Sequence, residues 1–210
     1  IPAGWTVSSS SNVATTTAIA STGNQSLRMT PASSEVIITS PEFAITPGCA
    51  TRLEFSHIPI LENQKGGRVE VKKPNGTWQT LSLNGTQTPN CYDPSYGGGY
   101  LQFNGAFFKT LYWTGNASIP LADLDQSYWK NEIFYLFSTL GGTATSVQIR
   151  FILPQTTGAA ANFTGWFLDD IRLYVASVPG DEIRVPQLKG TLQYPSLEMF
   201  PTCSDVPVRL

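Results

Sequence analysis

Two adjacent carboxylates, Asp169 and Asp170, are the residues whose chemistry stands out first in this sequence. They lie within residues 165–174 (GWFLDDIRLY), a segment that alternates as a β-strand does and ends in apolar residues. The alternation places Phe167 and Asp169 on the same face as Ile171 and Leu173, and Trp166 and Tyr174 on the other. Because Ile171 and Leu173 belong in a core, we expect Asp169 to face inward.

An inward carboxylate must be paired, hydrogen-bonded or bound to a metal, since an uncompensated buried charge is costly. Calcium takes about six to eight oxygen ligands, and Asp169 with carbonyl groups of an early loop would supply part of that set. Alternatively, Asp169 accepts hydrogen bonds from backbone amides or pairs with an arginine such as Arg150. The residues leave both possibilities open.

Three tyrosines form the second candidate site. Tyr92, Tyr96 and Tyr100 lie in residues 90–100 (NCYDPSYGGGY), which are rich in turn-forming residues. Tyrosines on a flexible loop are amphipathic contact groups suited to sugars or protein surfaces. In the alternative, their rings cover an edge of the protein's own sandwich.

Residues that would indicate catalysis are sparse. His57 is the only histidine and has no companion at a metal-ligand spacing, so we interpret it as a structural residue. No Gly-x-Ser-x-Gly nucleophile motif is present. Asp123 and Asp125 resemble a solvated turn more than the paired carboxylates of a glycosidase. The sequence therefore predicts a protein that is not an enzyme.

The three cysteines are Cys49, Cys91 and Cys203. An odd count in a chain of secreted type implies a free thiol or a partner elsewhere. We predict a Cys49–Cys91 disulfide, with Cys203 belonging to a following domain, although spacing alone also permits three unpaired cysteines.

The elements that must position these residues read as short strands separated by turns. Residues 51–60 (TRLEFSHIPI) alternate, with Leu53 and Phe55 inward and Arg52 and Glu54 outward. Residues 67–83 predict a β-hairpin around Pro74-Asn75-Gly76. No helical period is sustained, which indicates an all-β jelly-roll (concanavalin-like) β-sandwich over residues 1–176. Residues 177–193 resemble a linker, and residues 194–210 the truncated start of a following Ig-like β domain.

Composition limits the class of protein and its cellular location. The 210 residues suffice for one all-β core, only 13% of them are charged and the net charge is −2. Such a balance gives no basic footprint for nucleic acid. No apolar run is long enough for membrane insertion as a helix. The abundance of Ser, Thr, Gly, Asn and Pro favours a secreted or cell-surface protein, and the opening residues suggest a piece of a longer chain.

Four short motifs carry a family resemblance across residues 1–176. They are Pro2-x-Gly4-Trp5, Ser40-Pro41-x-Phe43, Leu53-x-Phe55-x-His57 and residues 165–171 (GWFLDDI). In this order they resemble the MAM-like jelly-roll modules of bacterial surface proteins, including the cleaved-adhesin modules of gingipain type. The tail resembles the start of an Ig-like or CARDB-like module.

The resemblance implies a large Bacteroidetes-type adhesin, exported by the type IX secretion machinery, with a structural calcium ion near Asp169 and Asp170. It predicts a non-catalytic adhesion or ligand-binding module whose partners are host or surface glycans or proteins. The alternative is a carbohydrate-binding module attached to a secreted hydrolase. An acidic or Asn-rich early segment, which usually helps to bind calcium in such modules, is sparse here.

Overall fold

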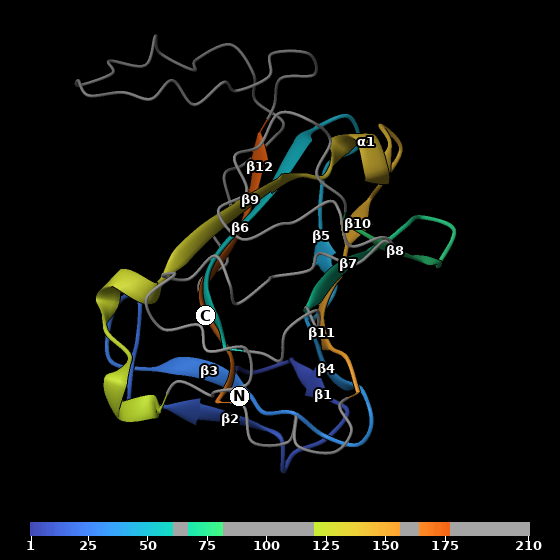
Figure 1. Cartoon of the computed structure of the whole chain (residues 1–210). Coiled ribbons are helices and arrows are strands. Elements are labelled where there is room, and N and C mark those ends of the chain that lie inside the picture. Colours follow the sequence, from blue (N-terminus) through green and yellow to red (C-terminus); the bar gives the residue numbers. More distant parts are fainter. Residues whose placement is uncertain (61–66, 82–119, 156–163, 177–210) are drawn as a thin grey trace, which may run out of the picture.

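The computed structural model describes residues 1–60, 67–81, 120–155 and 164–176 (Figure 1). In these ranges the backbone forms short strands joined by turns, with helix confined to single turns. The strands are β1 (Thr6–Val7), β2 (Val13–Thr16), β3 (Ser26–Met29), β4 (Val36–Thr39), β5 (Phe43–Ala44), β6 (Ala50–Ile60), β7 (Arg68–Lys72), β8 (Trp78–Thr80), β9 (Lys130–Tyr135), β10 (Ser146–Val147), β11 (Ile149–Leu153) and β12 (Gly165–Ala176). The helical pieces are two 3₁₀ turns, Leu121–Asp123 and Gln126–Tyr128, and the single-turn helix α1 (Phe137–Leu140).

Two five-stranded antiparallel sheets face each other. Sheet A has the order β1-β4-β11-β7-β8 and sheet B the order β2-β3-β12-β6-β9. A small β5–β10 pair completes the described pairings. Figure 1 shows the two sheets as separate layers, with the 3₁₀ turns of residues 121–128 on the outer side of sheet B. The predicted all-β jelly-roll sandwich is confirmed.

Aromatic side chains fill the space between the sheets. Phe55 on β6 lies edge-on to Phe151 on β11, with ring centroids 5.1 Å apart. Phe151 in turn contacts Trp166 on β12, with centroids 5.8 Å apart. All three rings are buried, and Ile171 and Leu173 are buried in the same core cluster. The predicted inward position of Ile171 and Leu173 is therefore confirmed.

A β-bulge corrects the predicted faces of β12. Asp169 pairs with Ser56 and Arg172 with Glu54, so three steps along β12 match two along β6. Such an insertion reverses the alternation of every later residue. Trp166 faces the core, where its contact with Phe151 places it, and Phe167 and Asp169 consequently face outward. The prediction that Asp169 shares the face of Ile171 and Leu173 was wrong.

The predicted hairpin is confirmed by β7 and β8. Lys73 and Thr77 close its turn through a backbone hydrogen bond of 2.8 Å, and Gly76 supplies the positive φ of 83° that the turn needs. Residues 177–210, with the predicted linker, Ig-like start and Cys203, lie outside the described residues.

Candidate binding face

A row of two tyrosines and an arginine crosses the outer face of sheet B. Arg52 on β6 lies opposite Tyr174 on β12 and opposite Tyr135 on β9. Side chains directly opposite each other in antiparallel strands share one face of the sheet. The Arg52 guanidinium lies over the Tyr174 ring, 4.5 Å from its centroid, and Tyr135 on the other side of Arg52 is 41% exposed.

Charged groups continue this surface along the strands. Glu54 lies opposite Arg172 and forms a 2.9 Å ion pair with Arg52. Arg172 donates to Asp170 at 3.0 Å. A hydrogen bond with the Tyr174 side chain, aided by the charge of Asp170 and opposed by partial burial, raises the pKa of the Arg172 guanidinium. We call Arg52, Glu54, Tyr135, Arg172 and Tyr174 the Tyr–Arg face.

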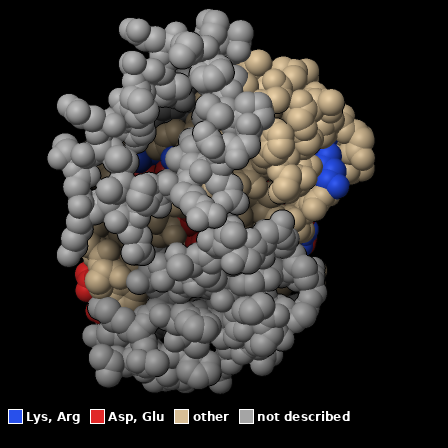
Figure 2. Space-filling model, turned by 90° about the horizontal axis from the view of Figure 1, so that it is seen from above, with Lys and Arg blue, Asp and Glu red and all other residues tan. Residues whose placement is uncertain are grey.

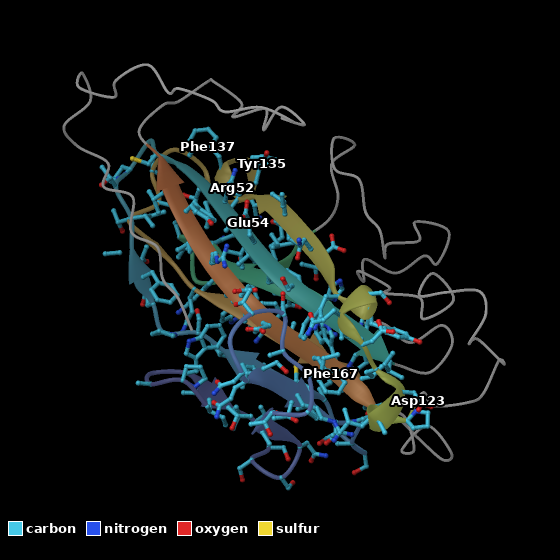
Figure 3. All side chains as sticks on the ribbon, turned by 90° about the vertical axis from the view of Figure 1, so that its left-hand side faces the viewer. Arg52, Glu54, Asp123, Tyr135, Phe137 and Phe167 are labelled. Atoms are coloured by element: carbon cyan, nitrogen blue, oxygen red, sulfur yellow. The ribbon has the colours of Figure 1, made fainter. Side chains whose placement is uncertain are left out.

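Phe137 extends this surface at one end. It is 39% exposed and begins α1, two residues after Tyr135. Figure 3 looks onto this side of sheet B and shows Phe137, Tyr135, Arg52 and Glu54 gathered toward one end of β6, β9 and β12, with Phe167 and Asp123 toward the other. The exposed aromatic surface of the described residues is thus concentrated beside a guanidinium–carboxylate pair.

This combination of side chains is suited to binding. Tyrosine offers a flat apolar ring with a polar hydroxyl, and arginine presents a rigid fork of donors. Aromatic residues and arginine are also the side chains enriched where partners dock. Strand alternation had placed Arg52 and Glu54 outward, but it gave no sign that Tyr135, some 80 residues later, would lie beside them.

Asp169 and Asp170 lie on the bulge of β12 and tie it to an early segment of the chain. Oδ2 of Asp169 accepts the backbone amides of Ser21 and Thr22, at 2.7 and 3.2 Å. Oδ1 of Asp169 accepts the amide of Asp170 at 2.7 Å. The alternative of backbone amide donors is what the structure shows for Asp169.

These contacts also test the fit of calcium. Three N–H groups point at the carboxylate of Asp169, whereas a calcium site needs oxygen atoms converging on the ion. In the described parts of the chain, no three His, Cys, Asp or Glu side chains form a metal-binding group. The described residues therefore fit an amide-bonded carboxylate better than a cation site.

The remaining predicted site residues are placed only in part. Tyr92, Tyr96, Tyr100 and Cys91 lie outside the described residues. Cys49 is buried and disulfide-bonded, and its partner lies in the undescribed part, so the Cys49–Cys91 pairing stays a prediction. Asp123 and Asp125 are exposed, and Asp125 caps the second 3₁₀ turn by accepting the amide of Ser127 at 2.8 Å.

His57 is a core residue, as expected. Its ring is fully buried, and its Nδ1 accepts the indole N–H of Trp166 at 3.1 Å. We therefore assign the proton of the neutral ring to Nε2, which lies 3.4 Å from Oε1 of the buried Glu132. Burial lowers the pKa of His57, and Glu132 opposes part of that shift.

This lowered pKa predicts a pH-dependent stability. Below the ordinary value of 6.5, the unfolded histidine takes up a proton that buried His57 resists. Its contribution is therefore complete above pH 6.5, and the free energy of unfolding falls as the pH drops, by up to about 1.4 kcal/mol per pH unit. Urea denaturation at several pH values between 7.5 and 5 measures this slope.

His57→Gln is the matched control, because a glutamine amide can accept from Trp166 and donate toward Glu132 without titrating. We expect its stability to depend less on pH than that of the wild type over this range. Equal slopes in the two proteins would assign the pH dependence to other groups.

Most arginines of the described sheets are paired with carboxylates, and Arg28 on β3 instead donates to the carbonyl oxygen of Thr164. Figure 2 shows isolated charged groups, not a basic patch, on the described surface seen from above. On sheet A, Arg68 and Arg150 both bind Glu70, and Arg68 also binds Glu35. Within the described ranges, no helix is long and apolar enough to span a membrane.

An open groove of about 650 Å³ lies beside residues 17–20, 23–24 and 124–126. Its lining mixes small residues such as Ala18 and Ala20 with aliphatic and polar ones, and Asp125 is its one charged residue. Aromatic and charged groups do not converge there as they do on the Tyr–Arg face, so the groove is the weaker candidate.

Comparisons with known proteins give distant structural likenesses. No protein-family model matches the sequence, and no curated protein matches it.

Among solved structures, a CBM61 module (TmCBM61) in complex with β-1,4-galactotriose has a TM-score of 0.43 at 15% identity, covering 82% of this chain and 88% of that one. The CBM22-1 xylan-binding domain of Paenibacillus barcinonensis Xyn10C has a TM-score of 0.41 at 12% identity, covering 82% and 86%. The K3 cleaved adhesin domain of Lys-gingipain from Porphyromonas gingivalis has a TM-score of 0.38 at 15% identity, covering 82% and 93%. Likenesses at this level assign neither a family nor a ligand.

Proposed function

We propose that the chain is a non-catalytic binding module of a secreted or cell-surface bacterial protein, and that it holds its ligand on the Tyr–Arg face. The observation that carries the proposal is the Tyr174–Arg52–Tyr135 row, which lies on the outer face of a sheet with Tyr135 open to solvent. The ligand class is a surface glycan or a protein surface. Export by the type IX machinery, as cargo of a large adhesin, belongs to the same proposal and rests on the sequence resemblance.

The pairing of the carboxylates supports a binding role without catalysis. Glu54, Glu70 and Asp170 each bind an arginine, so these acids are held in ion pairs. A glycosidase needs two carboxyl groups across a sugar-binding cleft, one of them able to hold a proton. Carboxylates held in ion pairs with arginine are committed to those contacts and do not stand free beside a bound sugar.

A carbohydrate-binding module attached to a secreted hydrolase is the second candidate. The Tyr–Arg face carries two arginines and, with Asp170, two carboxylates, so its formal charge balances. A surface of balanced charge with an exposed ring suits a neutral, hydroxyl-rich ligand, which stacks on tyrosine and accepts hydrogen bonds from arginine.

Removing Tyr135 tests the assignment of the face. We expect Tyr135→Ala to weaken binding about tenfold or more, equivalent to at least ~1.4 kcal/mol, because exposed aromatic rings at the centre of a contact carry much of its energy. The measurement screens the full chain on a glycan array and on immobilised bacterial and host surface proteins. The affinity for each hit is then determined for the wild type and the variant.

The opposite sheet offers a matched control. On the outer face of sheet A, Arg150 lies over the Trp78 ring at 4.2 Å, as Arg52 lies over Tyr174 on sheet B. We expect Trp78→Ala to leave the affinity within about twofold of the wild type. A loss with Trp78→Ala and none with Tyr135→Ala would move the binding site to sheet A and overturn the proposal.

A further inference from the structure

We propose that the junction between β12 and the early segment of residues 19–22 is closed by the protein's own hydrogen-bond donors and not by calcium. In this proposal the carboxylate of Asp169 holds the junction together by accepting hydrogen bonds from backbone amides. A structural calcium ion would instead hold it by binding oxygen atoms. The bulge that it holds also sets the faces of Arg172 and Tyr174. The proposal does not depend on what the Tyr–Arg face binds.

The oxygens of Asp169 are already occupied by donors. Ser21 and Thr22 direct their amides at Oδ2, and the amide of Asp170 is directed at Oδ1, all between 2.7 and 3.2 Å. N–H groups present the positive ends of their dipoles, which stabilise an anion and repel a cation at the same position. A calcium ion would have to displace these amides, and in the described structure each of them would lose that acceptor.

Asp170 also has hydrogen-bond partners of its own. Its Oδ1 accepts the hydroxyl of Thr22 at 2.7 Å and the guanidinium of Arg172 at 3.0 Å. A calcium ion bound to Asp170 would lie close to the positively charged guanidinium of Arg172. The two positive charges would repel each other. The second predicted ligand therefore has a cation of its own already.

Two carbonyl groups of the early segment have hydrogen-bond partners too. The carbonyl oxygen of Ile19 accepts the hydroxyl of Ser26 at 2.6 Å, and that of Ala20 accepts the Gln126 side chain at 2.8 Å. Ser21 adds a hydroxyl contact of 3.1 Å to Ser56 on β6. The carbonyls of Ile19 and Ala20 thus join this segment to β3 and the 3₁₀ turn, and the hydroxyl of Ser21 joins it to β6.

The same contacts stabilise the bulge. Asp170 has a φ of 48°, the one positive value among the described residues other than glycine. Aspartate tolerates this left-handed conformation at a modest cost, which its bonds to Thr22 and Arg172 help to offset. Because the extra residue reverses the alternation, Arg172 and Tyr174 point outward while Ile171 and Leu173 enter the core.

The test measures the full chain with calcium chloride and with EDTA, by thermal unfolding and by titration calorimetry. We expect the Tm of the wild type to be the same in both, within about 1 °C, and calcium to give no binding heat. A Tm that rises with calcium, or a binding isotherm lost in Asp169→Asn, would overturn the proposal and support the calcium site.

Asp169→Asn tests the amide contacts themselves. An asparagine keeps one acceptor oxygen but turns an N–H₂ group toward the other donors. We expect the Tm to fall by roughly 3–10 °C, as follows from losing several part-buried hydrogen bonds in a domain of this size. In hydrogen exchange, the amides of Ser21 and Thr22 should lose protection first. Unchanged protection of both amides would contradict the proposal.

Asp123→Asn is the matched control, since Asp123 is exposed in the neighbouring 3₁₀ turn. It removes the same charge and should change neither the Tm nor the exchange of Ser21 and Thr22. If Asp169→Asn fails to fold, the calcium titration of the wild type still decides between amide donors and a bound cation.

Discussion

Replacing Gly165 with alanine is expected to destabilise the domain strongly. Gly165 begins β12 with a φ of 115°, a conformation that residues with a side chain rarely adopt. A Cβ at this position would lie 2.3 Å from the carbonyl oxygen of Met29 in the adjacent strand β3. Since the obstacle is backbone, the sheet itself would have to separate.

The two effects act together. A strained φ costs about 1–3 kcal/mol and overpacking a further ~1–3 kcal/mol, against a typical total stability of about 5–15 kcal/mol. Urea denaturation of the purified variant, or its soluble yield if it fails to fold, measures the loss.

Alanine substitutions at two other glycines separate the cost of the strained φ from the cost of the steric clash. Gly23 has a φ of 66°, and a Cβ added there would meet no heavy atom within 4 Å, so Gly23→Ala carries only the conformational cost of about 1–2 kcal/mol. Gly142 has neither a positive φ nor a contact closer than 3.8 Å, and Gly142→Ala should be neutral. If Gly165→Ala lowers the free energy of unfolding no more than Gly23→Ala does, the result would contradict the close approach of β3 and β12 at Gly165.

Strand alternation predicted much of the fold because it follows from the geometry of a single strand. Leu53 and Phe55 face the core as expected, and Arg52 and Glu54 face outward. The turn around Gly76 closes the predicted hairpin. Each of these features depends on neighbours in sequence, so one segment at a time was enough to predict it.

The bulge could not be predicted in the same way. Alternation assumes one residue on β12 for each residue on β6, and the extra residue near Asp170 breaks that count. The faces of Trp166 and Asp169 were therefore exchanged in the prediction. What holds the bulge is a segment about 148 residues away in sequence, where Ser21 binds Asp169, and no local pattern reports such a contact.

The candidate site depends even more on long-range pairing. Arg52, Tyr135 and Tyr174 come from three strands, and only the register of sheet B brings them into one row. The sequence favoured tyrosines of residues 90–100 because they are close together in the chain. Proximity in sequence indicates a loop site well and a sheet-face site poorly, since neighbours on a sheet face come from different strands.

Trp166→Ala is expected to have the second large effect. The indole is fully buried, contacts Phe151 and donates its N–H to His57. It also packs so closely on Gly67 that a Cβ there would lie 2.5 Å from the ring, so the surrounding backbone is shaped to this side chain. The cavity costs about 3–5 kcal/mol, and losing the buried hydrogen bond adds roughly 1–3 kcal/mol.

Trp166→Phe divides that loss into its two parts. Phenylalanine retains much of the packing but cannot donate to Nδ1 of His57, so we expect a smaller destabilisation, near the ~1–3 kcal/mol of an unmade buried hydrogen bond. Trp78→Ala removes an indole of the same size from the half-buried outer face of sheet A and should cost less than Trp166→Ala. Urea midpoints of the three variants order them. If Trp166→Phe were as damaging as Trp166→Ala, the hydrogen bond to His57 would outweigh the packing, which would make the polar group in the core the dominant stabilising contact of β12.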